Sequence, residues 1–173
     1  MPFTTLDLSK QSGTSLPSSI VTASGLTTGK VLQAVQSQPY AGQSSLTTGM
    51  VEYTGGNVSI TPSATSSKVL IMITGSLMVG RNGQSQTHGS GRTHIYRDST
   101  DIDIHCECGQ NYGSMGSSSS WADHGITFNN IGLDSPNTTS SVTYKLYFRG
   151  GGNLQGYVPM GGHITFTALE IAA

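Results

Sequence analysis

The segment Asp101–Cys108, with the sequence DIDIHCEC, gathers more metal-binding side chain types than any other stretch of the chain. Alternate residues of a β-strand share a face. One face of this segment then carries the polar residues Asp101, Asp103, His105 and Glu107. Cys106 and Cys108 fall on the opposite, apolar face, where a free cysteine behaves as a small hydrophobe. Because alternate strand residues stand too far apart for a relaxed disulfide, we expect core cysteines rather than a zinc or redox site.

The acids of this region have two interpretations. In the first, their carboxylates are solvated or are paired with Arg92 or Arg97 on a neighbouring strand. In the second, Asp98, Asp101 and Asp103 provide oxygen ligands for Ca²⁺. The chain contains neither an EF-hand loop nor a glycine-rich calcium repeat. We therefore expect solvated or arginine-paired carboxylates, and we assign no metal and no other cofactor.

Residues with the spacing of an active site are not found. Asp123 and His124 lie near serines, but the chain has no GxSxG elbow to present a nucleophile. Glycoside cleavage needs two carboxylates facing each other across a cleft, and nine acids spread along the chain do not single out a pair. We expect no catalytic residue and a protein that is not an enzyme.

Aromatic and polar side chains in glycine- and serine-rich segments are the candidate recognition groups. These segments are expected to form loops over Gly80–Gly91, Gly109–Ser120 and Gly150–Gly161. The candidate surface-recognition residues are Arg81, Asn82, His88, Asn111, Tyr112, Trp121 and Tyr157. Aromatic rings beside Ser, Asn and Gly give stacking surfaces and adaptable polar contacts, as sugar recognition requires. Trp121 is equally well explained as the first residue of a strand, buried in the core.

Strands must position these loops. Ser67–Leu77, with the sequence SKVLIMITGSL, is almost continuously apolar and predicts a strand buried on both faces at the centre of a β-sandwich. Val142–Arg149 alternates apolar and polar residues, which predicts a strand with one buried face. Further strands are expected at Lys30–Gln38, Arg92–Arg97, Asp101–Cys108, Trp121–Asn130 and Gly162–Ala172.

The turn signals complete the prediction of the fold. Gly55-Gly56 separates Met50–Tyr53 from Asn57–Thr61 and predicts a hairpin. Eight to ten short strands with polar turns and no helical pattern predict an all-β protein, a jelly-roll-like antiparallel β-sandwich.

Length and charge limit the classes of protein to which the chain can belong. The chain has 173 residues, enough for one domain, and only 10% of them are charged, with a formal net charge of −1. Such a chain lacks the basic surface that nucleic acid or an anionic membrane requires, and no apolar run reaches the ~18 residues of a membrane span. We expect neither nucleic-acid binding nor membrane insertion. The start of the chain lacks a signal-peptide pattern, and Cys106 and Cys108 form no disulfide framework. Together these features predict synthesis in a reducing cytoplasm.

Residues 1–29 differ from the predicted β domain, which covers residues 30–173. They carry scattered apolar residues with neither a helical nor a strand period, on a background of Ser, Thr and Gly. The apolar anchors of this arm are Phe3, Leu6, Leu8, Leu16, Ile20 and Val21. Because an isolated arm cannot offset its own ordering entropy, it either lies along the surface of a partner or is a disordered leader.

Several phrases along the β domain, in this order and spacing, resemble structural proteins of tailed bacteriophages, particularly marine ones of the cyanophage type. The phrases are GKVLQAVQ at Gly29–Gln36, ITPSATSSKVLIMITG at Ile60–Gly75, THIYRDSTDI at Thr93–Ile102, DSPNTTSSVTYKLYFR at Asp134–Arg149 and ITFTALEIA at Ile164–Ala172. Within the arm, Gly13–Ile20 is similar to the linker that precedes phage fibre heads.

The resemblance implies a non-enzymatic virion structural protein with a jelly-roll-like head, commonly a homotrimer. It implies a tail fibre or spike head on the exterior of the virion, made in the bacterial host cytoplasm. Residues 1–29 would attach the head to another virion protein, a tail adaptor or the major capsid protein. The loops would face outward, toward a host surface glycan. The alternative is a capsid decoration protein whose arm staples neighbouring capsomers.

Overall fold

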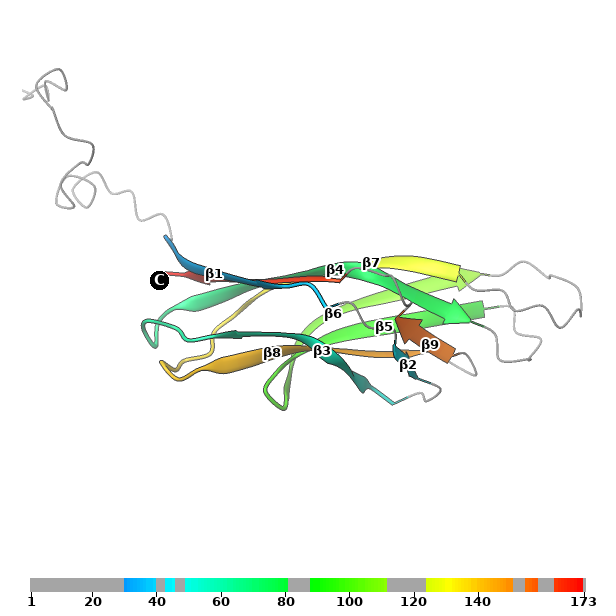
Figure 1. The fold of residues 1–173 in the computed structure, drawn as a ribbon, viewed down its shortest axis with the longest axis horizontal. Helices are drawn as coiled ribbons and strands as arrows, with labels where there is room; N and C mark the ends of the chain where they lie inside the picture. The colour runs from blue at the N-terminus through cyan, green and yellow to red at the C-terminus, as the bar shows by residue number, and fades with distance from the viewer. Residues whose placement is uncertain are drawn as a thin grey trace, which may run out of the picture.

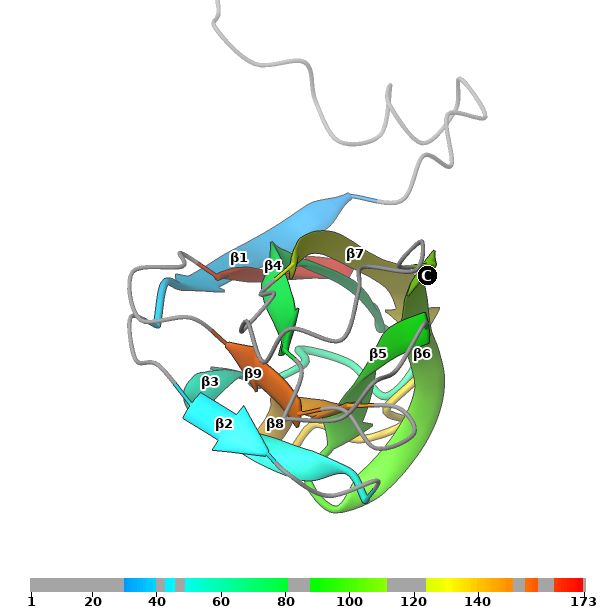
Figure 2. The same ribbon diagram turned by 90° about the vertical axis from the view of Figure 1, so that its right-hand side faces the viewer.

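The computed structural model describes residues 30–39, 43–45, 49–80, 88–111, 124–150, 155–158 and 164–172. Regular structure in these ranges consists of ten β-strands in two antiparallel sheets that lie face to face (Figures 1 and 2). The predicted all-β antiparallel sandwich is therefore confirmed. The described part of the chain contains no helix with the length and apolar character of a membrane span. The predicted arm, residues 1–29, lies outside the described residues.

The strands follow the chain in order. They are β1 (Val31–Ser37), β2 (Gln43–Ser45), β3 (Val51–Ile60), β4 (Lys68–Gly80), β5 (His88–Arg97), β6 (Thr100–Asn111), β7 (His124–Asp134), β8 (Val142–Gly150), β9 (Gln155–Val158) and β10 (Thr165–Ile171). The larger sheet contains β1, β10, β4 and β7, extended by β9 and β2. The smaller sheet has the order β3-β8-β5-β6.

The strand pairs are nested along the chain. β5 pairs with β6, β4 with β7, β3 with β8 and β1 with β10, so each pair encloses the one before it. The contacts β10–β4 and β8–β5 then join these pairs into two sheets. A long hairpin rolled up in this way is the jelly roll, with its two four-stranded sheets. The strands β2 and β9 pair with each other and extend the larger sheet beyond β10, because β4 continues past the end of that strand.

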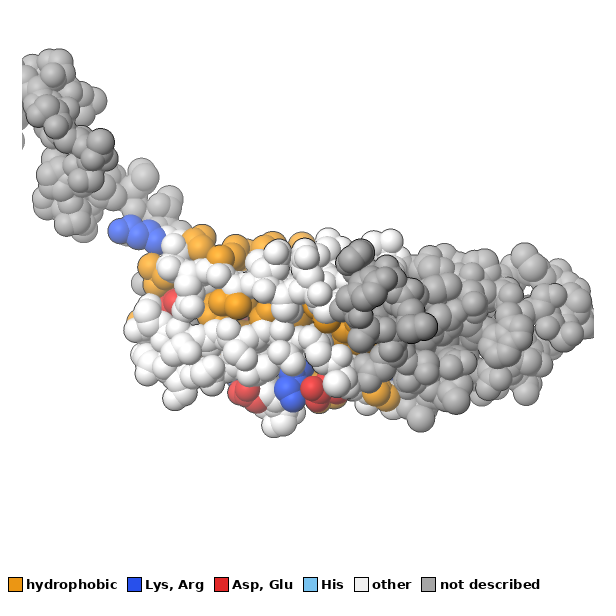
Figure 3. All heavy atoms as spheres, in the orientation of Figure 1, with side chains coloured by type: hydrophobic (Ala, Val, Ile, Leu, Met, Phe, Trp, Pro, Cys, Tyr) orange, Lys and Arg blue, Asp and Glu red, His pale blue; other side chains and the backbone are white. Residues whose placement is uncertain are grey.

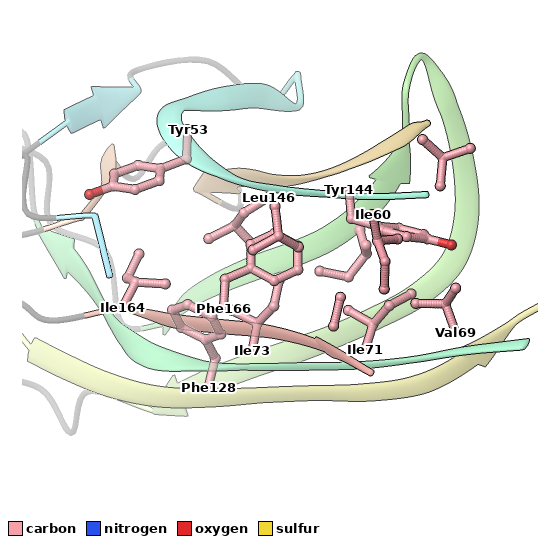
Figure 4. Close-up of a cluster of buried hydrophobic side chains, with 14 of the residues drawn as sticks. Tyr53, Ile60, Val69, Ile71, Ile73, Phe128, Tyr144, Leu146, Ile164 and Phe166 are labelled. Carbon is pink, nitrogen blue, oxygen red and sulfur yellow. The ribbon is translucent and has the colours of Figure 1, made fainter. Parts of the chain in front are cut away.

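The core lies between the sheets and follows from alternation along the strands. On β4, Val69, Ile71 and Ile73 point inward and are fully buried, and Leu146 and Phe148 face them from β8. Figure 4 shows Val69, Ile71, Ile73 and Leu146 meeting between the two sheets. The largest fully buried side chains are Tyr53, Phe128, Tyr144, Phe148 and Phe166. Each side chain of this size contributes roughly 1.5–3 kcal/mol by leaving water.

The hairpin predicted at Gly55-Gly56 is wrong, because β3 runs through it as one strand. Both halves of β3 pair with β8, and the register shifts between Glu52 and Asn57. Gly55 has a φ of 87°, which permits a bulge as readily as a turn. A Cβ on Gly56 would stand 2.2 Å from the ring of Tyr53. The glycines therefore let the strand bend around a core tyrosine.

The prediction that both faces of β4 are buried is confirmed for one face only. β4 lies in the interior of the larger sheet, between β7 on one side and β10 and β9 on the other. Its inward residues are fully buried, but Leu70 and Met72 point outward and are half-buried. No second layer within the described ranges covers them.

One ion pair joins the two sheets at the end of β7. Arg97 on β5 donates from Nη1 to both carboxylate oxygens of Asp134, at 2.8 and 2.7 Å. The hydroxyl of the fully buried Tyr144 on β8 donates to the same carboxylate at 2.7 Å. Burial, together with the Asp134 carboxylate, raises the pKa of Tyr144 far above its usual value. A second tie is fully buried: the hydroxyl of Thr93 donates to Oδ1 of Asn130 at 2.8 Å.

A buried carboxylate ties β10 to the segment before β4. Glu170 is 1% exposed and accepts from the backbone N–H and the hydroxyl of Ser63, both at 2.7 Å, and from Gln33 Nε2 at 2.7 Å. Burial alone raises the pKa of Glu170, but these hydrogen bonds and one from Ser67 outweigh it and lower the pKa to about 2. The group is therefore ionised and satisfied at neutral pH.

Candidate functional site

The two ends of the sandwich differ in what they carry. At one end, the start of β1 and the end of β10 lie side by side, and the N–H of Ala172 donates to the carbonyl of Lys30 at 2.9 Å. Strand pairing brings the boundaries of the predicted loops to the other end, since His88 pairs with Asn111 and Val79 with His124. Figure 1 shows this long-axis polarity, with β1 beginning at the left and β4 ending at the right.

The predicted recognition residues divide into two groups. Arg81, Asn82, Tyr112 and Trp121 lie outside the described residues. His88, Asn111 and Tyr157 belong to strands instead, at the start of β5, the end of β6 and within β9. Strand residues therefore occupy part of each segment that was predicted to be a loop. Their glycine- and serine-rich composition favours loops, but backbone pairing with neighbouring strands overrides it.

The outer face of the smaller sheet carries most of the charged side chains among the described residues and is called the charged face below. Its outward residues are Glu52, Arg92, His94, Tyr96, Asp101, Asp103, His105, Glu107, Lys145, Tyr147 and Arg149. Arg92 donates to Glu107 on the neighbouring strand at 2.7 Å, which confirms an arginine partner for one acid of the DIDIHCEC segment. This hydrogen bond lowers the pKa of Glu107. Arg97, the other arginine considered, pairs with Asp134 on β7 instead.

Two imidazole rings stack on this face. His94 and His105 have ring centroids 4.9 Å apart and are tilted by 17°. Each contacts its own carboxylate, His94 Nδ1 at 2.8 Å from Asp101 and His105 Nδ1 at 3.1 Å from Asp103. The sequence did not predict this pair. A regular two-residue turn after Arg97 would place His94 opposite Asp103, but a bulge in β6 moves His105 into that position.

A second ring pair lies beside the histidines. Tyr96 and Tyr147 have centroids 4.0 Å apart. The Tyr147 hydroxyl donates to Glu52 at 3.0 Å, and Lys145 contacts the same carboxylate at 3.2 Å. Burial and the Glu52 carboxylate raise the pKa of Tyr147. Short polar contacts thus join the aromatic rings and the charged groups of this face and orient them.

Two of the three acids considered for calcium accept hydrogen bonds from backbone N–H groups of the protein. Asp98 accepts from the backbone N–H of Thr143 at 2.9 Å, which docks the β5–β6 turn onto β8. Asp101 accepts from the backbone N–H of Asp103 at 2.9 Å as well as contacting His94. Asp98 and Asp103 adopt positive φ, as the turn and the bulge require. In the described ranges no cluster of three or more His, Cys, Asp or Glu residues is arranged to hold a metal ion.

The cysteine prediction is confirmed where the structure describes it. Residues of β6 alternate between exposed and half-buried from Asp101 to Glu107, as the period of two predicted. Cys106 falls on the inner side and packs against the core together with Ile102 and Ile104. The Cys108 side chain lies outside the described part of the structure.

The outer face of the larger sheet has the opposite character and is called the apolar face below. Its apolar residues are Val31, Leu32, Ala34, Leu70, Met72, Ile131, Leu133, Leu169 and Ile171. Strand register aligns Ala34, Leu169, Leu70 and Leu133 in one row across β1, β10, β4 and β7. Ile131 is 58% exposed and Leu133 55%. Figure 3 views the sandwich edge-on, with apolar side chains along its upper edge and charged ones along its lower edge.

Charge is almost absent from the apolar face. Among the described outward residues of β1, β10, β4 and β7, only Lys68 is charged, and it donates to Ser135 at 3.0 Å. Beyond the apolar rows the face continues with Thr74, Asn129 and Thr165, which lie in one register row. An apolar centre bordered by uncharged polar side chains is the composition of a protein interface.

Comparison with known proteins adds no family to this description. No protein-family model matches the chain, and no curated protein sequence matches it. Among solved structures, it is similar to the T=1 particles derived from infectious bursal virus, with a TM-score of 0.34 and 16% identity over 83% of this chain and 37% of that one. It is also similar to the VP2 subviral particle of infectious bursal disease virus, with a TM-score of 0.30 and 18% identity over 83% and 38%. The chain thus spans less than half of these proteins, and its jelly-roll assignment rests on its own strand order.

Proposed function

We propose that this chain is a non-enzymatic structural protein of a tailed-bacteriophage virion, an exposed fibre or spike head that assembles as a homotrimer. Residues 1–29 attach the head to another virion protein, a tail adaptor or the major capsid protein. The opposite end of the sandwich carries the segments that contact a host surface glycan. The resemblance of five phrases along the β domain to phage structural proteins supports this assignment.

The observation that carries the proposal is the long-axis polarity of the sandwich. Lys30 and Ala172 are hydrogen-bonded at one end, so the attachment segment leaves the domain there. The predicted loops begin and end at the opposite end, where His88 and Asn111 form a register pair. A head anchored at one end and exposed at the other is the geometry that a projecting virion component requires.

The capsid decoration protein is the second candidate. The same polarity suits it, because an arm leaving one end of the domain can staple neighbouring capsomers while the sandwich stands outside as a knob. Copy number distinguishes the two functions, since tail fibres are few and decoration proteins are many in each virion.

The test is to quantify this protein in purified virions of the phage that encodes it, with antibody labelling in the electron microscope. Low copy number with label at the tail supports the fibre or spike head. High copy number with label over the capsid supports the decoration protein. Absence of the protein from washed virions, with the major capsid protein as the positive control, contradicts both.

Contact with the host is tested separately. Purified protein added in excess is expected to compete with phage adsorption, and a variant that replaces Tyr112 and Trp121 with Ala is expected to compete less well. The matched control is the double variant Ser140→Ala and Ser141→Ala, which changes exposed positions at the other end of the sandwich. Equal competition by both variants contradicts the role of the two aromatic residues.

A further inference from the structure

We propose that the apolar face is the surface through which copies of this chain bind one another. Each copy covers the apolar rows of a neighbouring copy, and the charged face stays in water. The inference deepens the proposed function, because it names the surface on which assembly of the head depends. It concerns the sandwich alone and needs no contribution from residues 1–29.

The first support is a mismatch between the sequence of β4 and its surroundings. A strand that is apolar on both faces is normally covered on both faces. Within the described ranges the isolated chain covers only the side of Val69, Ile71 and Ile73. Leu70 and Met72 face outward with no second layer over them. A layer supplied by another molecule resolves the mismatch.

The second support is the alignment of neighbouring strands. Leu70 pairs with Leu133 on one side and with Leu169 on the other, and Met72 pairs with Ile131. Apolar residues from β10, β4 and β7 thus form one continuous patch rather than isolated exposed side chains. Continuous patches of this kind mark interaction sites on soluble proteins.

The third support identifies the occupant as a second copy. When copies of one face meet around a symmetry axis, charged side chains near the axis face their own copies, which costs free energy. The apolar face avoids this cost, since Lys68 at its border is its single charged side chain among the described residues.

The area of the apolar face also fits a second copy of the chain. Four strands spaced about 4.8 Å apart and about nine residues long give a flat outline of roughly 19 × 30 Å, or about 570 Å² before side-chain relief. A standard interface buries about 800 Å² of accessible surface on each partner. An anionic membrane fits less well, because membrane-binding surfaces carry several Lys or Arg residues beside the apolar ones.

The test compares one new charge on each outer face. Leu133→Glu places a carboxylate in the apolar row, and Asn57→Glu places one at an exposed position of the smaller sheet. The mass of each full-length protein is measured by light scattering over a range of concentrations. We expect a multiple of 18.0 kDa for the unmodified chain and for Asn57→Glu, and 18.0 kDa for Leu133→Glu. Circular dichroism reports whether each variant is folded.

A milder variant keeps the test decisive if Leu133→Glu does not fold. Ile131→Thr retains a β-branched side chain at a position that is 58% exposed. It is expected to raise the dissociation constant of the assembly about tenfold, as loss of one apolar contact at an interface centre does.

Three outcomes overturn the inference: a monomeric unmodified chain, an assembly that Leu133→Glu and Ile131→Thr leave unchanged, or an assembly that Asn57→Glu disrupts equally. Binding of the unmodified monomer to anionic vesicles would assign the apolar face to a membrane instead. A dimer that dissociates in Leu133→Glu supports the inference and contradicts the proposed trimer. Presence in virions together with a monomeric head contradicts the inference and leaves the proposed virion role intact.

Discussion

The two outer faces of this sandwich are built by the same strand geometry and differ completely in chemistry. On the smaller sheet, outward positions hold acids, arginines, histidines and tyrosines joined by short polar contacts. On the larger sheet, the equivalent positions hold leucine, isoleucine, methionine, threonine and asparagine. Since both sheets bury an apolar inner face equally well, the need for a core does not explain the difference. The proposed assembly through the apolar face would account for the contrast, because it gives the two faces different surroundings.

The contacts of Asp134 with Arg97 and Tyr144 join the two sheets across the core. Removing them is expected to give the largest loss of stability. Asp134→Ala leaves Arg97 and the Tyr144 hydroxyl without their shared carboxylate. Because it removes one partner from a largely buried ion pair, we expect the free energy of unfolding to fall by about 3 kcal/mol. Urea denaturation of the full chain measures the loss. Glu107→Ala, which removes the exposed partner of Arg92, is the control. Equal losses of unfolding free energy in the two variants would contradict a special contribution of the Asp134 contacts.

Protein concentration sharpens the comparison without a mutation. If copies bind through the apolar face, assembly stabilises the folded state by mass action. At a concentration about 100-fold above the dissociation constant this amounts to about 2.7 kcal/mol. We expect the melting temperature of the unmodified chain to rise with concentration, and that of Leu133→Glu to stay constant. A melting temperature of the unmodified chain that does not change with dilution argues against assembly.

Lowering the pH tests how much the buried Glu170 carboxylate contributes to stability. The pKa of Glu170 is lowered to about 2 in the folded state. Its contribution is therefore complete above the usual carboxyl pKa near 4.5 and is lost as the pH falls from there toward 2. Glu170→Gln should lower the free energy of unfolding by about 2 kcal/mol at pH 7, because it removes hydrogen bonds to a charged acceptor.

The pH dependence separates this effect from a general loss of packing. Unfolding is measured at pH 7 and at pH 3 for the unmodified chain and for Glu170→Gln. The difference between the two proteins should shrink at the lower pH, where the unmodified chain loses part of its advantage. A difference that does not change with pH would assign the effect to side-chain shape rather than to ionisation.

The charged face should tolerate changes best. Glu107→Gln removes the partner of Arg92 at a site where the carboxylate side chain is 55% exposed. Exposed ion pairs contribute little to stability and are screened by salt. We expect the smallest change of all the variants, and one that vanishes at high salt. A loss as large as that of Asp134→Ala would show that the charged face is buried in the assembly.

The fold could be predicted from the sequence where one period dominates a strand. Alternation in Val142–Arg149 and in DIDIHCEC predicted which side chains point inward, and the structure confirms both over the described residues. The doubly apolar run in β4 predicted its central place in a sheet. It could not show that no second layer among the described residues covers the outer face of β4.

Glycine and bulges account for the features that could not be predicted. Gly55-Gly56 suits a turn and a bulge equally, and only the pairing of both flanking segments with β8 distinguishes them. The stacked His94 and His105 depend on extra residues in β6 that shift the register. Arg97 pairs with Asp134 of the other sheet rather than with an acid on its own sheet. Each outcome depends on tertiary pairing, which a local pattern does not contain.

The most direct measurement compares the two faces in the same molecules. Hydroxyl-radical footprinting with mass spectrometry reports the oxidation of Met72 on the apolar face and of His105 on the charged face. We expect Met72 to be protected in the unmodified chain and oxidised several-fold faster in Leu133→Glu, with His105 oxidised at the same rate in both proteins. Equal oxidation of Met72 in the two proteins, or protection of His105 in the unmodified chain alone, would contradict assembly through the apolar face.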